Sequence, residues 1–262
     1  MFRALYTAAS GMSAQQLSLE NIANNLANAN TVGFRSRRLQ FENLMYQNVV
    51  VPGSAMTQQT TIPAGLQIGL GTRPASSEVI DTPGNLTSTG NQLDVAIQGN
   101  GYFQVLTPTG QLAYTRDGSF HLNQQRQLVT SDGNPLQPAI TIPANALSVS
   151  IGADGTVSVT EPNQSQAAQV GSIQLALFPN PGGLLGIGGN LFVPTTASGD
   201  PLVGAPGSAE GLGSLQQGMV EESNVSVVEQ FIQMILAQRS YEANSKVVQA
   251  ANQMLQQLNN IA

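Results

Sequence analysis

Apolar residues near the start of the chain recur at alternating spacings of three and four residues. From Leu5 to Ala29, every position with this spacing is apolar except Gln15. Residues with this spacing lie on one side of a helix and form the contact stripe of a coiled coil. The pattern predicts a long N-terminal helix that packs against a second helix, with Gly33 as its C-terminal stop. The predicted seam consists of Leu5, Ala8, Met12, Leu19, Ile22, Leu26 and Ala29.

A second helical pattern occupies the C-terminal end, where apolar residues fall seven apart. The residues between them, such as Ala237 and Asn244, are smaller or polar, which allows a partner helix to approach closely. Ser226 and Glu229 have the S-x-x-E spacing of a capping box and predict where this helix begins. The predicted seam consists of Val220, Val227, Met234, Tyr241, Val248, Leu255 and Leu258.

The middle of the chain changes character twice. Residues 46–91 are rich in Pro, Gly, Thr and Ser and predict an extended linker. Residues 92–206 carry short alternating runs separated by Asp-Gly pairs, which predict strands joined by tight turns. We therefore expect an α+β fold, in which N- and C-terminal helices pair as a coiled coil around an extended linker and a mainly β domain. The expected divisions are residues 1–45, 46–91, 92–206 and 207–262, the last containing the C-terminal helix.

Charge is scarce along the whole chain. Charged residues make up only 9% of the sequence, and the formal net charge is −6. A soluble domain normally carries about a quarter of charged residues, so the surface of this protein is poorly protected against self-association. Three of the nine basic residues form the one short basic cluster, Arg35, Arg37 and Arg38, which is interpreted as a solvated helix end or loop and not as a nucleic-acid site.

The residues that catalysis or metal binding would need are few. The chain has no cysteine and a single histidine, His121, which lies on a predicted hairpin. Glu221 and Glu222 precede the predicted C-terminal helix and are expected to favour its N-terminus. No glycine-rich loop fits a nucleotide-binding fingerprint. The sequence predicts no catalytic residue, no cofactor and no metal site, and it has no apolar run long enough to span a membrane or to resemble a signal peptide.

The two predicted helices have wide uncharged faces. Apolar residues such as Ile232 and Ile235 lie off the C-terminal seam, so one partner helix would not cover them all. The N-terminal helix carries Asn21, Asn24 and Asn25 where solvated helices usually carry Glu or Lys. Burial in an assembly of several copies explains both features, because isolated helices of this kind are marginal in water.

Three segments resemble the bacterial flagellar axial proteins, the rod and hook family. They are NIANNLANANTVGF, GNQLDVAIQGNGYFQV followed by AYTRDGSF, and EESNVSVVEQFIQMILAQRSYEANSKVVQAANQML. Within that family, the length and the linker MYQNVVVPGSAMTQQTTIPAGLQIGLG are similar to members that build the distal rod. A proximal rod or hook-like member is the alternative inside the family. A secreted β-domain binding module with oligomerising helical ends is the alternative outside it.

The resemblance implies a structural subunit without enzymatic activity. It implies export through the flagellar type III apparatus without a cleaved signal peptide, followed by helical polymerisation into the rod. The rod crosses the periplasm inside the P and L rings, meets proximal rod proteins and hook protein at its ends, transmits torque and encloses the export channel. The terminal helices are expected to form the inner tube and the β domain to face outward. The resemblance also implies that the segment from Met45 to Gly65 stiffens the rod and that Phe41 and Met45 fit an export-gate motif.

Overall fold

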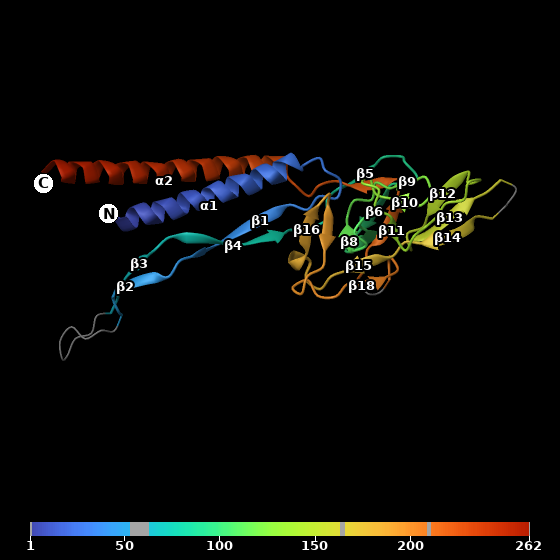
Figure 1. Ribbon diagram of the computed structural model, residues 1–262, viewed down its shortest axis with the longest axis horizontal. Helices are drawn as coiled ribbons and strands as arrows, with labels where there is room; N and C mark the ends of the chain where they lie inside the picture. Colours follow the sequence, from blue (N-terminus) through green and yellow to red (C-terminus); the bar gives the residue numbers. More distant parts are fainter. Residues whose placement is uncertain (1, 53–62, 163–165, 209–210, 262) are drawn as a thin grey trace. The chain divides into compact units, whose positions relative to one another are not determined.

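The computed structural model describes residues 2–52, 63–162, 166–208 and 211–261, with only the backbone for 258–261 (Figure 1). The chain folds into two compact units. The helical unit comprises Met1–Leu26, Arg37–Glu78 and Val227–Ala262, and the β unit comprises Ala27–Ser36 and Val79–Ser226. Each unit therefore contains segments that lie far apart in the sequence.

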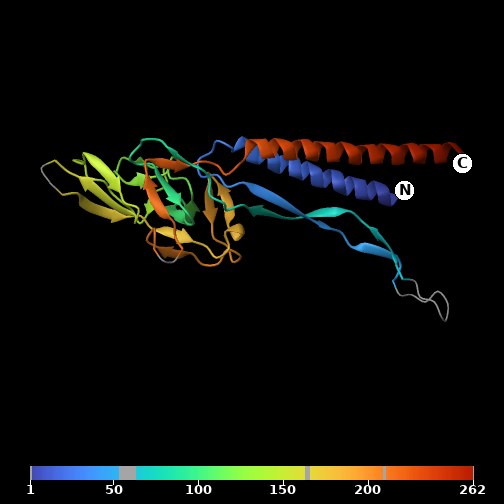
Figure 2. The same ribbon diagram turned by 180° about the vertical axis from the view of Figure 1, so that it is seen from behind.

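Two long helices dominate the helical unit. Helix α1 spans Phe2–Ala27 and helix α2 spans Val227–Ile261. They lie side by side in both views (Figures 1 and 2). Asn25 contacts Gln230, whereas Gly11 faces Asn244, so the helices run antiparallel. The pairing of the two ends of the chain confirms the coiled-coil prediction, and α2 begins directly after Ser226, where the capping-box spacing placed it.

Four strands complete the helical unit. Strand β1 (Arg37–Asn43) pairs with β4 (Thr72–Val79), and β2 (Tyr46–Val50) pairs antiparallel with β3 (Leu66–Gly69). Much of the segment expected to be an unpatterned linker is thus paired strand. Its high content of Thr and β-branched residues suits strands even though the alternation is weak.

The β unit is built around a sheet of seven strands. Its order is β16, β17, β8, β7, β15 and β18, and β11 pairs with β7 outside this order. The pairings between the strands of this sheet are antiparallel, as expected for strands joined by short turns. The strands are β7 (Tyr102–Leu106), β8 (Leu112–Thr115), β11 (Leu136–Gln137), β15 (Leu175–Leu177), β16 (Leu185–Gly188), β17 (Leu191–Val193) and β18 (Leu202–Gly204).

Smaller sheets and one short helix surround this sheet. Strands β12, β13 and β14 form a three-stranded sheet, while β19 pairs with β6, β20 with β5 and β10 with β9. Their bounds are β5 (Leu86–Ser88), β6 (Val95–Gln98), β9 (His121–Leu122), β10 (Leu128–Val129), β12 (Ser148–Ile151), β13 (Thr156–Thr160), β14 (Ala168–Ser172), β19 (Ser214–Gln217) and β20 (Met219–Glu221), with the 3₁₀ helix η1 at Pro181–Gly183.

Strand β7 separates two hydrophobic clusters in the β unit. Phe103 and Val105 belong to the larger cluster, while Tyr102 belongs to the smaller one, because successive side chains of a strand point to opposite faces. Phe103 meets Phe120 edge to face at 5.1 Å, and Tyr102 meets Phe178 at 6.0 Å. Burial on both faces makes this strand the centre of the unit.

The structure departs from the sequence-based boundaries at both helices. Helix α1 ends at Ala27, six residues before Gly33, and Ala29 lies in the turn beyond it. Val220 lies in β20 instead of the C-terminal helix. Residues 207–226 contribute β19 and β20 to the β unit. Seven-residue spacing alone does not distinguish a helix residue from an apolar residue of a neighbouring strand. Val220 keeps the spacing of the helix although it lies in a short strand.

The Asp-Gly pairs serve two different purposes. Gly133 and Gly155 have φ of 84° and lie in tight turns, as predicted. Gly118 does not have a positive φ, so it does not have the hairpin-turn conformation predicted for an Asp-Gly pair. A Cβ atom there would overlap the carbonyl oxygen of Val95, so this glycine permits close approach of two backbones.

Gly33 has a similar role and supports a prediction. Its φ is +68°, and a Cβ atom would lie 2.6 Å from the backbone carbon of Arg116. We expect Gly33→Ala to lower the free energy of unfolding by about 3 kcal/mol, from the left-handed conformation and the clash together. Gly110→Ala is the matched control, because Gly110 has φ of +79° with open space around it, and should cost about 1 kcal/mol. Urea unfolding followed by circular dichroism compares them, and equal losses would contradict the close approach.

Candidate assembly surfaces

Helix α2 turns its small and amide side chains toward α1. The Nδ2 atom of Asn25 donates a hydrogen bond of 3.3 Å to Oε1 of Gln230. A Cβ atom on Gly11 would lie 2.8 Å from Nδ2 of Asn244. Gln230 and Ala237 are buried, as is Ala251 one heptad beyond Asn244. Close helix approach follows from the small size of these residues.

The larger residues of the predicted C-terminal seam flank this contact. Met234, Val248 and Leu255 are half-buried, while Val227 and Tyr241 are exposed. The side chain of Leu258 lies outside the described residues. These side chains therefore have surface left over for other contacts.

The predicted N-terminal seam is only partly enclosed. Ala8 and Ile22 are buried, and Ala29 lies beyond the helix end. The remaining seam residues are half-buried: Leu5, Met12, Leu19 and Leu26. Ile22 lines an open groove of about 320 Å³ together with Gln15, Ser18 and Ala237, so the pairing of one α1 with one α2 leaves a groove along the helix contact.

The first turns of α2 expose a cluster of large apolar side chains, which we call the apolar face. Val228 is 69% exposed and Ile235 is 55% exposed. Contiguous apolar surface on a helix marks an interaction site, because its burial contributes about 25 cal/mol per Å². The apolar face consists of Val228, Phe231, Ile232, Ile235 and Leu236.

The character of α2 changes beyond this face. Arg239 and Glu242 form an exposed ion pair with an N–O distance of 3.8 Å. After Lys246 the sequence has no charged residue up to its end, and glutamines and asparagines prevail. The helix thus passes from an apolar through a charged to a neutral polar segment.

A second exposed apolar group lies on the strands of the helical unit. Met45 is 85% exposed, and Phe41, Tyr46, Val49 and Leu66 are exposed as well. Phe41 lies in β1, while Met45 follows that strand. The two residues of the proposed export motif are therefore accessible. Of the segment from Met45 to Gly65, residues 53–62 lie outside the described residues.

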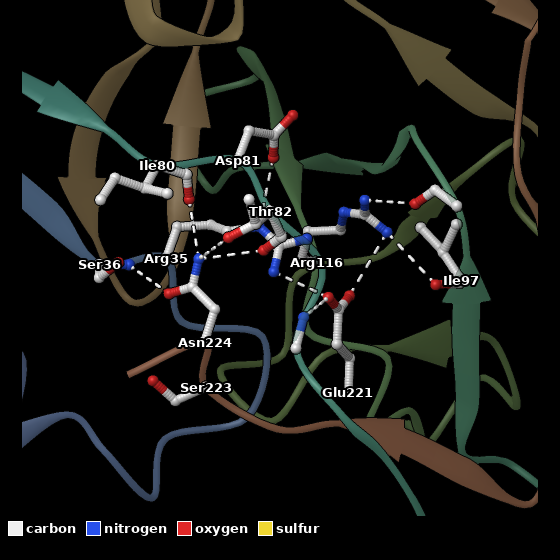
Figure 3. Close-up of polar contacts among 12 residues, drawn as sticks. Arg35, Ser36, Ile80, Asp81, Thr82, Ile97, Arg116, Glu221, Ser223 and Asn224 are labelled. Carbon is white, nitrogen blue, oxygen red and sulfur yellow. Dashed lines mark hydrogen bonds and ion pairs between the residues drawn. The ribbon is translucent and has the colours of Figure 1, made fainter. Parts of the chain in front are cut away.

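The β unit contains a buried network of charges, drawn in Figure 3. Nη1 of Arg35 lies 2.7 Å from Oε1 of Glu221, and Nε of Arg35 lies 3.2 Å from Oδ1 of Asp81. Nη1 of Arg116 lies 3.3 Å from the other oxygen of Glu221. The side chains of Arg35, Arg116 and Glu221 have no solvent exposure. The hydroxyl of Tyr102 donates to Asp81 at 2.6 Å.

Backbone groups provide further partners for the network. The amide of Gly84 donates to Oε1 of Glu221 at 2.8 Å, and Arg116 donates to the carbonyl oxygen of Gly99 at 2.6 Å. Beside it, Oδ1 of Asn224 accepts from the amide of Ser36 at 2.7 Å (Figure 3). Buried charges are tolerated only with such partners. The network thereby joins four segments that are distant in the sequence.

Burial shifts the pKa values of two groups in this network. Desolvation lowers the pKa of Arg116, opposed by the negative charge of Glu221. Desolvation, reinforced by the charge of Asp81 and its hydrogen bond, raises the pKa of Tyr102 above its ordinary value of 10.0. The Tyr102 hydroxyl therefore acts as a permanent donor at neutral pH.

The sequence interpretation did not anticipate this network. The sequence predicts a solvated position for Arg35 and a role at a helix N-terminus for Glu221, and both predictions are wrong because both side chains are fully buried. Glu221 lies in β20, six residues before α2. The one signal in the sequence is composition. In a chain with so few charged residues, each charged residue is a stronger candidate for a specific contact than it would be in a charge-rich chain.

Removing the central carboxylate should destabilise the β unit strongly. Glu221→Gln leaves Arg35 and Arg116 with insufficient negative charge, and we expect the free energy of unfolding to fall by about 3 to 5 kcal/mol. Glu222→Gln is the matched control, because Glu222 is exposed and its side chain accepts a hydrogen bond from the hydroxyl of Thr87. That control should change stability by less than about 1 kcal/mol in urea unfolding. Equal effects would contradict the role given to Glu221.

Tyr102 predicts a pH dependence with a definite sign. Below pH 10 the phenol is neutral in both states; above it the unfolded chain ionises while the folded chain does not. The free energy of unfolding should therefore fall as pH rises above about 10. Tyr102→Phe should reduce that slope, although it also removes the bond to Asp81 at every pH. Urea unfolding between about pH 9 and 11.5 measures the slopes, and parallel curves would rule out this coupling.

The described residues contain no group of three His, Cys, Asp or Glu side chains that could hold a metal ion. Among the same residues, no helix is long and apolar enough to cross a membrane.

Three family models match successive parts of the chain. Residues 5–35 match the model described as flagella basal body rod protein, and residues 96–159 match the flagellar hook protein FlgE/F/G D1 domain. Residues 216–261 match the flagellar basal body rod FlgEFG protein C-terminal model. The matches thus cover both helices and the centre of the β unit.

Relatives are similar along the whole chain. The flagellar basal-body rod protein FlgG of Buchnera aphidicola subsp. Baizongia pistaciae is 49% identical over 98% of this chain and 99% of its own length. The FlgG protein of Caulobacter vibrioides is 49% identical over 97% of both chains. That of Borreliella burgdorferi is 46% identical over 100% of this chain and 99% of its own. The chain therefore belongs to the FlgG family of flagellar basal-body rod proteins.

Proposed function

We propose that this structural subunit of the distal rod polymerises through the apolar face of α2, which packs against neighbouring copies of the same chain. The observation that carries the proposal is the exposure of Val228, Phe231, Ile232, Ile235 and Leu236 on one stretch of helix. A face of this kind is stable only when covered. A second copy is the occupant that membership of a rod family supports.

The contacts of α1 and α2 are compatible with a helical polymer. The α2 seam toward α1 uses small residues and leaves the larger Tyr241 and Val227 exposed. Different surfaces of one chain can then meet different surfaces of the next, and such heterologous contacts build open helical filaments. Sparse charge on both helices removes repulsion between closely packed copies. Motility depends on this polymer because the rod transmits torque as the drive shaft of the flagellum.

The remaining contacts of the rod are part of the same proposal. Proximal rod proteins and hook protein would meet the polymer at its two ends, and the P and L ring proteins would surround it. The type III export apparatus would deliver the chain, with exposed Phe41 and Met45 available to an export gate. The segment from Met45 to Gly65 is proposed to stiffen the rod, and deleting it should yield curved filaments if it does so.

A charge on the apolar face tests the proposal. Ile235→Glu should abolish motility and lower recovered rods at least tenfold, because a carboxylate would be buried without a partner between copies. Gln238→Glu is the matched control: it adds the same charge at an exposed position of α2 and should leave motility near normal.

Folding of the variants must be separated from assembly. Ile235 is already exposed in the single chain, so the midpoint of urea unfolding should not change. Complementation of a strain lacking the rod gene, followed by electron microscopy of isolated basal bodies, reads out assembly. Normal rods built from the Ile235→Glu chain would overturn the proposed interface.

A further inference from the structure

A buried amide pair joins the two helices of the helical unit. Asn25 is only 2% exposed and Gln230 is buried as well. Nδ2 of Asn25 donates to Oε1 of Gln230 at 3.3 Å. On its other side, Asn25 binds one residue of β1: its Oδ1 accepts from the amide of Arg37 at 3.0 Å, and its Nδ2 donates to the carbonyl oxygen of Arg37 at 2.8 Å. The backbone of Arg37 thus fixes the orientation of the Asn25 side chain independently of α2.

Positions seven and fourteen residues from the amide pair carry no large apolar side chain. Moving down α1 from Asn25 by heptads leads to Ser18 and Gly11, and moving up α2 from Gln230 leads to Ala237 and Asn244. Ser18 and Ala237 line the same groove, and Gly11 faces Asn244, as antiparallel pairing requires. At these positions, size and shape alone specify the register weakly.

A slip of one heptad shows the difference. It moves α2 along α1 by about 10 Å, since a helix rises about 1.5 Å per residue. In one direction Gly11 would face Ala251 and Asn25 would face Ala237; in the other Gly11 would face Ala237. Each of these pairs is small enough to pack. In both directions Asn25 loses Gln230, and a buried amide without its partner is costly.

We propose that the hydrogen bond between Asn25 and Gln230 selects the register in which α1 and α2 pair. Small residues allow the helices to approach, while the amide pair distinguishes one alignment from its heptad-shifted alternatives. A single polar pair in a coiled-coil seam can specify register in this way. Because Arg37 orients Asn25 from within the same unit, the amide presents its donor to α2 in a defined position. Asn25 and Gln230 are positioning residues for the helix pair.

The absence of cysteine from the sequence makes the register measurable by disulfide trapping. Ser18→Cys with Ala237→Cys reports the native register in the purified full chain. Gln15→Cys with Val247→Cys, and Gln15→Cys with Gln233→Cys, report slips by one heptad in either direction. Each pair is placed in the parent chain and in the variant Asn25→Ala with Gln230→Ala. Disulfide formation requires Cα atoms within about 7 Å, so a slip of 10 Å changes which pair reacts.

The parent chain should trap the native pair almost exclusively. In the double variant, the ratio of slipped to native disulfide should rise about tenfold, the consequence of losing one buried hydrogen bond. Gln16→Ala with Gln238→Ala is the matched control: it removes two exposed amides, one from each helix, and should leave the ratio unchanged.

Each other result would count against the proposal. An unchanged ratio in the double variant would mean that packing and the chain connections specify the register. Slipped disulfides in the parent chain, or no disulfide at all, would show that the native register is not selected. An increase in the control variant equal to that of the double variant would attribute the effect to helix propensity.

Discussion

The arrangement of the β unit depends on one carboxylate placed between two guanidinium groups. Glu221 reaches Arg35 at 2.7 Å and Arg116 at 3.3 Å, with all three side chains hidden from solvent. A buried charge is tolerated only when its partners are present, so segments 33–36, 80–84, 97–116 and 221–224 must converge together. Two of these segments lie just after α1 and just before α2. The same interaction that stabilises the β unit therefore brings together the segment that follows α1 and the segment that precedes α2.

The helical unit follows a different rule. Its helices meet through small residues and a buried amide pair, and large apolar side chains remain on the outer surface of α2. In an isolated soluble protein such a surface would be a liability. In the assembly that we propose, burial of this surface provides the free energy for packing against further copies, and the shortage of charge lets the copies come close. The β unit is stable through its own core, whereas the helical unit is suited to being completed by neighbours.

Asparagine has a specific use in both units. Asn25 hydrogen-bonds to the backbone of Arg37 and to the side chain of Gln230. Asn224 accepts from the amide of Ser36 and donates through Nδ2 to the carbonyl oxygen of Ile80. An amide offers a donor and an acceptor without a charge, so it can bind a backbone segment inside a packed structure at low desolvation cost. This explains why amides stand where solvated helices carry Glu or Lys.

The sequence by itself determined the α+β class, the pairing of the terminal helices, the start of α2 and the family, because these depend on periodicity, capping spacing and long local motifs. Only the tertiary structure decided that Val220 belongs to β20 and that Arg35 and Glu221 are partners. The physical reason is range. Helix periodicity is a property of neighbouring residues, whereas the partner of a buried charge can lie 186 residues away, and nothing in the local pattern identifies it.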